Sequence, residues 1–102
     1  MANNTKAAMI GFLMKDSTAF LEKCIKRLYK EQTAGEQTVN QTVAQNNRGF
    51  NPADANKLSR LAKKLNENLS WHLDERDFND ASERMQKYSK QLARYLTDEE
   101  VV

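Results

Sequence analysis

The stretch Asn46-Asn47-Arg48-Gly49-Phe50-Asn51-Pro52-Ala53-Asp54-Ala55 combines a glycine turn with the start of a helix. The side-chain oxygen of Asn51 is suited to capping a helix, and Pro52 fits the first helical position, where no amide partner is needed. Asp54 follows three residues after the cap, beside the positive end of the helix dipole. The stretch therefore predicts a helix that begins at Pro52 and ends near Asn66.

Composition favours helices in the rest of the chain as well. The 102 residues include only one proline and three glycines, and Lys, Gln, Leu, Ala and Glu are abundant. This length suits one domain with a small hydrophobic core. We expect an all-α fold, a compact helical bundle of three main helices with a short N-terminal helical arm. The expected boundaries are 1–15 for the arm, 16–96 for a single helical domain and 97–102 for a frayed acidic tail.

Two further helices are predicted from apolar spacing. The first spans about Asp16 to Glu31, with an apolar face opposite a cationic surface that we interpret as solvated. The last begins after Asp74 and continues to about Leu96. Its apolar seam either packs in the bundle, which we favour, or pairs with a second protomer. The apolar positions of the first helix are Phe20, Leu21, Cys24, Ile25, Leu28 and Tyr29, its cations are Lys23, Lys26, Arg27 and Lys30, and the seam is Phe78, Ala81, Met85, Tyr88, Leu92 and Tyr95.

The remaining segments give weaker signals. In the arm, Gly11 is expected to break the helical regularity, and the apolar residues from Met9 to Met14 are expected to be buried in the monomer or against another chain. Residues 32–48 form a polar connection in which Thr33 and Glu36 have the spacing of a capping box, so a short helix near 34–40 is expected there. The role of this connection stays open.

No residue pattern predicts catalysis, a metal site or a cofactor. His72 is the single histidine, and Cys24 is the single cysteine and lies on a buried helix face. A metal site would need further ligands, and Ser70 and Ser82 lack a nucleophile turn. The apolar run 7–14 is too short to span a membrane and lacks the pattern of a secretion signal. We therefore predict a soluble intracellular protein that is not an enzyme.

Charge distribution points to an anionic partner. The net charge is only +2, but the stretch from Lys23 to Lys64 carries nine Lys or Arg residues against three acidic ones. Lys57, Arg60 and Lys64 recur on one helix face, for which a solvated lysine face is the default interpretation. The same face is suited to a line of phosphates. Phe50 or Trp71 would stack on a base, although for Trp71 we favour a place at the end of the core. The candidate contact residues are Arg48, Phe50, Lys57, Arg60, Lys64, Trp71, Lys87 and Arg94.

Several motifs resemble a family of small helical proteins of bacteriophages and prophages, whose domain also occurs attached to DNA helicases. They are Gln32-Thr33-Ala34-Gly35-Glu36-Gln37, then Gly49-Phe50-Asn51-Pro52-Ala53-Asp54-Ala55, Leu58-Ser59-Arg60-Leu61-Ala62 and Met85-Gln86-Lys87-Tyr88-Ser89-Lys90-Gln91-Leu92-Ala93. The family often has a small residue where Arg48 stands, and a shorter turn in place of 66–76. The resemblance implies Gly49, Phe50, Asn51 and Asp54 as motif residues, and action in the cytoplasm of a bacterial host.

Three functions remain open on these grounds. The first is an accessory protein that binds DNA or RNA through a basic helical face. The second is a phage-encoded inhibitor, such as an anti-CRISPR or other anti-defence protein, that binds a nucleic-acid-handling complex of the host with the same face. The third is a helical assembly protein, and a homodimer is compatible with each of the three.

Overall fold

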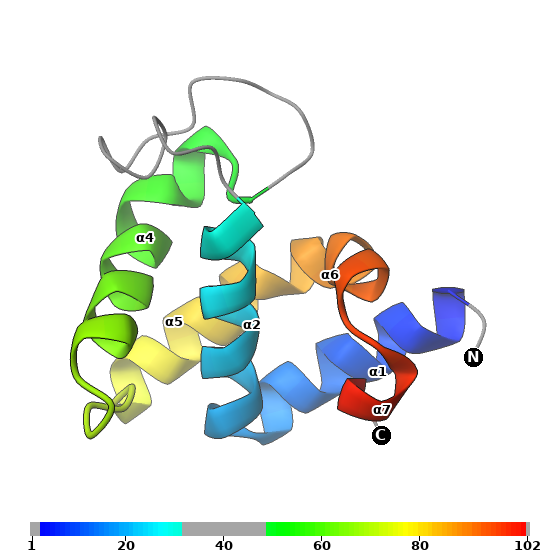
Figure 1. The fold of residues 1–102 in the computed structure, drawn as a ribbon, viewed down its shortest axis with the longest axis horizontal. Helices are drawn as coiled ribbons and strands as arrows, with labels where there is room; N and C mark the ends of the chain where they lie inside the picture. The colour runs from blue at the N-terminus through cyan, green and yellow to red at the C-terminus, as the bar shows by residue number, and fades with distance from the viewer. Residues whose placement is uncertain (1–2, 32–48, 102) are drawn as a thin grey trace.

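Helix α1 (Asn3–Asp16) and helix α2 (Thr18–Glu31) begin the chain in the computed structural model, which describes residues 3–31 and 49–101. Ser17 separates the two helices, and the N–H of Phe20 donates to its side-chain oxygen at 3.2 Å, as expected for a helix cap. The second described part contains α4 (Pro52–Glu67), α5 (Glu75–Met85), the 3₁₀ turn η1 (Gln86–Tyr88), α6 (Ser89–Tyr95) and α7 (Asp98–Val101) (Figure 1).

The described residues form helices and no strands, which confirms the all-α class. The helix predicted at Pro52 is also confirmed, since the N–H of Asp54 donates to Asn51 Oδ1 at 3.0 Å. Asp74 caps α5 in the same way. The expected short helix at 34–40 and the candidate contact residue Arg48 lie outside the described residues.

The count of three main helices is not confirmed. Helix α1 has 14 residues, as many as α2, so the N-terminal segment is a full helix rather than a short arm. The predicted last helix is divided, because η1 interrupts it between α5 and α6. At this break the side chain of Gln86 donates to the backbone oxygens of Ser82 and Gly11, which ties the interruption to α1.

The two ends of the chain also differ from expectation. Gly11 does not break α1: a Cβ on this buried residue would lie 2.8 Å from Gln86 Oε1, so glycine allows α1 to lie close to η1 and α6. Of the apolar side chains in the arm, Ile10 and Met14 are buried, but Phe12 is 66% exposed. The acidic tail expected to fray forms α7, where Val101 is 1% exposed because its side chain joins the core.

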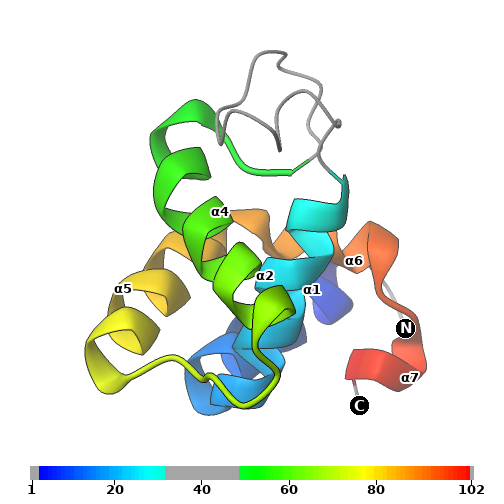
Figure 2. The same ribbon diagram turned by 60° about the vertical axis from the view of Figure 1, so that its left-hand side comes forward.

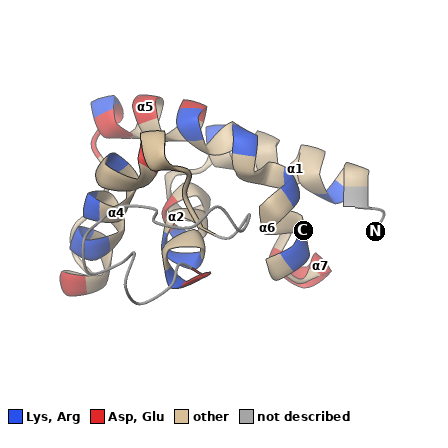
Figure 3. Cartoon of the chain, turned by 90° about the horizontal axis from the view of Figure 1, so that it is seen from above, with Lys and Arg blue, Asp and Glu red and all other residues tan. Residues whose placement is uncertain are grey.

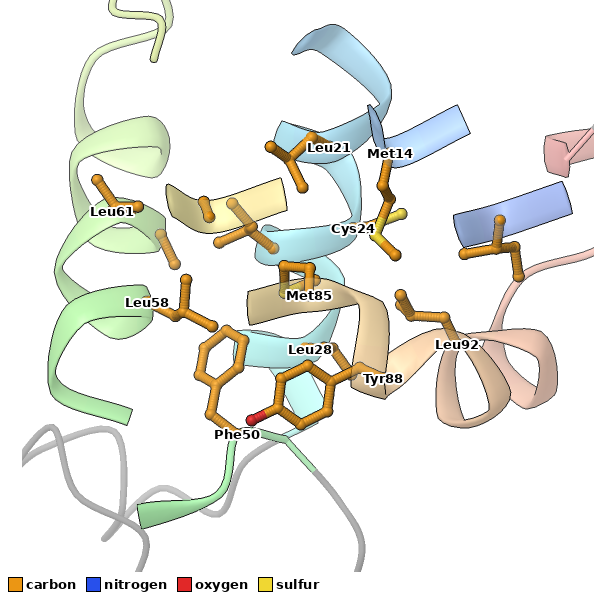
Figure 4. Close-up of a cluster of buried hydrophobic side chains, with 14 of the residues drawn as sticks. Met14, Leu21, Cys24, Leu28, Phe50, Leu58, Leu61, Met85, Tyr88 and Leu92 are labelled. Carbon is orange, nitrogen blue, oxygen red and sulfur yellow. The ribbon is translucent and has the colours of Figure 1, made fainter. Parts of the chain in front are cut away.

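Helix α2 lies at the centre of the fold and packs against α1, α4, α5 and α6 (Figures 1 and 2). Its predicted apolar face is buried, and side chains from α1, α4 and the η1 region meet it in one core (Figure 4). Among the described helices, none is long and apolar enough to cross a membrane. The fully buried members of this face are Leu21, Cys24, Ile25 and Leu28.

Candidate nucleic-acid interface

The glycine turn is anchored to the last third of the chain. Gly49 has a φ of 76°, a left-handed conformation that favours glycine, and its N–H donates to Gln91 Oε1 at 2.7 Å. The ring of Phe50 is 1% exposed and meets the ring of Tyr88 edge to face, with centroids 6.0 Å apart. Phe50 is therefore part of the core, and the prediction that it stacks on a base is wrong because its ring does not reach the surface.

Asp54 is a buried carboxylate with three partners from η1 and the end of α5. It accepts hydrogen bonds from Tyr88 Oη at 2.5 Å, Lys87 Nζ at 2.7 Å and Arg84 Nη1 at 3.0 Å. Burial by itself would raise the pKa of Asp54, but the hydrogen bonds from Lys87, Tyr88 and Arg84 outweigh it, so the pKa is lowered. Burial, and then the neighbouring Asp54, raises the pKa of Tyr88. Asp54 is therefore charged and joins the start of α4 to the end of α5.

This arrangement changes the interpretation of Lys87. Its ammonium pairs with Asp54 and lies 5.7 Å from the centroid of the Tyr88 ring. A cation held in this way has its charge compensated within the protein, so Lys87 has a structural role. No local pattern in the sequence indicates this ion pair, because Asp54 and Lys87 are 33 residues apart.

The cations of α4 also differ in whether they have partners within the protein. Lys57 pairs with Asp77 of α5 at 3.1 Å and lies 4.0 Å from Asp80, so carboxylates compensate its charge. Lys64 lies over the partly buried ring of Trp71, which packs against the core. Arg60 of α4 and Arg94 of α6 are exposed. Of the predicted contact residues that the structure describes, Lys57 and Lys87 are therefore paired with carboxylates, whereas Arg60 and Arg94 stay exposed.

A different basic surface lies on α2. Its cations occupy positions i, i+3, i+4 and i+7, which places them on one side of the helix. They line a groove of about 490 Å³ that Asn66, at the end of α4, and the C-terminal segment also border. In Figure 3 the Lys and Arg positions of α2 lie on the side turned away from α5. The groove is lined by Lys23, Lys26, Arg27, Tyr29, Lys30, Asn66, Leu96 and Glu100.

The cations of this groove differ in their partners. Lys23 Nζ lies 3.2 Å from Glu100 Oε2, and Arg27 Nε lies 3.6 Å from Glu31 Oε1. Within residues 3–31 and 49–101, Lys26 and Lys30 have no ion pair, and Arg27 Nε has no hydrogen-bond partner. Glu100 is the one described carboxylate that borders the groove. The surface therefore keeps uncompensated positive charge where a ligand has access.

Other polar groups of the described chain have structural roles. The buried side chain of Glu22 accepts a hydrogen bond from the N–H of Leu73 at 2.8 Å. It forms a second hydrogen bond with His72 Nδ1 at 3.1 Å. These two contacts hold the α4–α5 connection on α2. Burial raises the pKa of Cys24 to about 12, so its thiol stays protonated. In the described segments, no three His, Cys, Asp or Glu side chains gather as metal ligands would.

Comparison with family models, curated proteins and solved structures finds no match for this chain. The resemblance to small phage proteins thus stays a prediction. Sequence inspection identified the α2 cations but interpreted them as a solvated face. It did not associate them with Asn66 or Glu100, since that association depends on the packing of α4 and α7 beside α2.

Proposed function

We propose that this protein is a non-enzymatic accessory protein that binds nucleic acid through the groove on α2. The observation that carries the proposal is the row of four cations along α2, which lines a groove bordered by a single described carboxylate, Glu100. Phosphates of DNA or RNA are the ligands that such a row of ammonium and guanidinium groups recognises.

The length of the row supports a chain of phosphates as the ligand. Lys23 and Lys30 are seven residues apart, which corresponds to roughly 10 Å along a helix axis. A single small anion needs fewer cations, whereas a polyanion engages several along its backbone. Asn66 adds an amide at the border of the groove, where it has access to a sugar or a base.

This groove and the predicted contact residues of α4, which are Lys57, Arg60 and Lys64, lie on different sides of α4. Lys57 contacts α5 and Lys64 contacts Trp71, whereas Asn66 of the same helix borders the groove. Pairs of variants on the two sides therefore give a matched comparison. K26E/K30E reverses two groove charges, and R60E/K64E makes the same change in net charge on the other side.

The test is fluorescence anisotropy with labelled single- and double-stranded DNA and RNA, at low and at physiological salt. We expect binding that weakens steeply with salt, and K26E/K30E should weaken it about tenfold or more, since two phosphate contacts are lost. R60E/K64E should stay within about threefold of the unmodified protein, as expected for a general charge effect.

Two results would contradict the proposal. Equal losses in the two double variants would show an effect of net charge alone. Absence of binding at low salt would move the assignment to a protein target, and a host complex that handles nucleic acid would then be sought by pull-down from lysate. Circular dichroism of both variants provides the control for folding.

A further inference from the structure

The C-terminal segment holds a carboxylate at the edge of the groove by contacts of its own. The N–H of Thr97 donates to Glu100 Oε1 at 2.9 Å, and the N–H of Glu100 donates to Thr97 Oγ1 at 3.2 Å, the reciprocal pattern of a capping box. The buried side chain of Val101 and the ion pair between Asp98 and Lys6 fix α7 against α1. Glu100 is thereby positioned without help from the groove.

The other oxygen of this carboxylate reaches into the cationic row. Glu100 Oε2 lies 3.2 Å from Lys23 Nζ, and the side chain of Lys23 is 49% exposed, so a ligand also has access to it. The hydrogen bond from Thr97, and next Lys23, lower the pKa of Glu100 to about 2. The carboxylate is therefore charged at any physiological pH.

We infer that Glu100 competes with the phosphates of the ligand for Lys23 and so limits the affinity of the groove. The inference rests on the proposed function, because it concerns the same ligand. A carboxylate held at the position where an anion would bind acts as an internal substitute for that anion. Lys23 then contributes a phosphate contact only when the pair with Glu100 is broken.

The neighbouring glutamate provides a matched control. Glu99 is exposed, and within the described residues it makes no ion pair. E99Q and E100Q raise the net charge by the same amount, but only E100Q releases Lys23. Glutamine at position 100 also keeps an oxygen that accepts the hydrogen bond from Thr97, so α7 should be retained.

The experiment measures the Kd of the full chain for a fluorescein-labelled 20-nucleotide oligothymidylate over a series of salt concentrations. E100Q should bind about two- to fivefold more tightly than E99Q, which corresponds to one partly exposed ion pair. The slope of log K against log salt should become steeper by about 0.7, the value for one additional phosphate contact on a single strand. K23Q should remove this gain from E100Q.

Each outcome separates this inference from the proposed function. If E99Q and E100Q have equal Kd values and equal salt slopes, while K26E/K30E still weakens binding, the role of Glu100 is overturned and the groove remains the binding site. Absence of binding by both the unmodified protein and E100Q would overturn both. Thermal unfolding of E100Q, followed by circular dichroism, shows whether α7 and the fold are preserved.

Discussion

At the scale of single residues, Asp54 shows how a local signal acquires a second role. In the sequence it is an acidic residue in the first turn of a helix, where its negative charge interacts favourably with the positive end of the helix dipole. In the fold the residue is 1% exposed, and its carboxylate receives hydrogen bonds from Arg84, Lys87 and Tyr88. Because charged hydrogen bonds are strong and their loss leaves buried groups without partners, this cluster should stabilise the attachment of α4 to η1 and the end of α5.

D54N tests this contribution. We expect the free energy of unfolding, measured by urea denaturation, to fall by about 2–3 kcal/mol, the usual loss for hydrogen bonds to a charged group. D80N is the control, because Asp80 pairs with the same arginine but its side chain is 41% exposed. That variant should lose less than about 1 kcal/mol. Equal losses of unfolding free energy in D54N and D80N would show that burial does not make the ion pairs of Asp54 more stabilising.

The same comparison has an expected pH dependence. The pKa of Asp54 in the folded protein is lowered below the ordinary value of 3.8. As pH falls, the Asp54 carboxylate is therefore protonated in the unfolded chain before it is protonated in the folded protein. The stabilisation by the ionised carboxylate is complete above the unfolded-state pKa and is lost as pH falls through the folded-state pKa. The stability difference between the unmodified protein and D54N should therefore be constant near neutral pH and shrink below pH 3.8. A difference that grows on acidification would contradict the lowered pKa.

At the scale of elements, the contact of α1 with η1 and α6 depends on a small residue. Gly11 accepts a hydrogen bond from Gln86 Nε2 at 2.9 Å, and an added Cβ would lie 3.2 Å from Ser89 Oγ. The end of the Gln86 side chain is able to shift, but Ser89 also lies close to the position of the added atom. Close packing, rather than flexibility, explains the glycine in this helix.

Two substitutions at Gly11 should therefore differ. G11A should stay within about 1 kcal/mol of the unmodified protein, because the helix propensity gained by alanine offsets the shift of Gln86. G11L should lower the free energy of unfolding by about 1–3 kcal/mol through overpacking. A8L, at an exposed position of the same helix, is the control and should have little effect. If G11L unfolds at the same urea concentration as A8L, the close approach of the helices is not required.

At the scale of the whole molecule, α1 belongs to the common core. It packs against α2, α5, α6 and α7, and its buried residues join the same hydrophobic cluster as those of α2 (Figure 1). The N-terminal segment expected as an arm therefore packs into the same core as the rest of the described chain. Removal of contacts from α1 should affect the cooperative unfolding of the entire chain.

I10A and M9A test this prediction at adjacent positions. Ile10 is fully buried, so its replacement should create a cavity and lower the free energy of unfolding by about 2–5 kcal/mol in a single transition. Met9 is 37% exposed, and M9A should lose less than about 1 kcal/mol. Tryptophan fluorescence and circular dichroism should report the same midpoint for I10A. Separate midpoints, or a negligible loss in I10A, would show that α1 is an independent arm.

Local signals in the sequence identified the start of α4 and the buried side of α2. Asn51 and Pro52 specify a helix start without help from distant residues, since a cap and a fixed φ act over one turn. The apolar spacing of α2 likewise identified the side that is buried. These features depend only on the periodicity of the helix and on groups within four residues of one another.

Tertiary packing alone decided which charged and aromatic side chains are available to a partner. Phe50 is part of the core through its contact with Tyr88, and Lys87 is part of an internal ion pair with Asp54. In both cases the two residues are more than 30 positions apart. The groove on α2 likewise requires Asn66 and Glu100, which the sequence separates from Lys23 by more than 40 residues. Burial and ion pairing depend on neighbours in space, and helical periodicity determines only which side of each helix meets them.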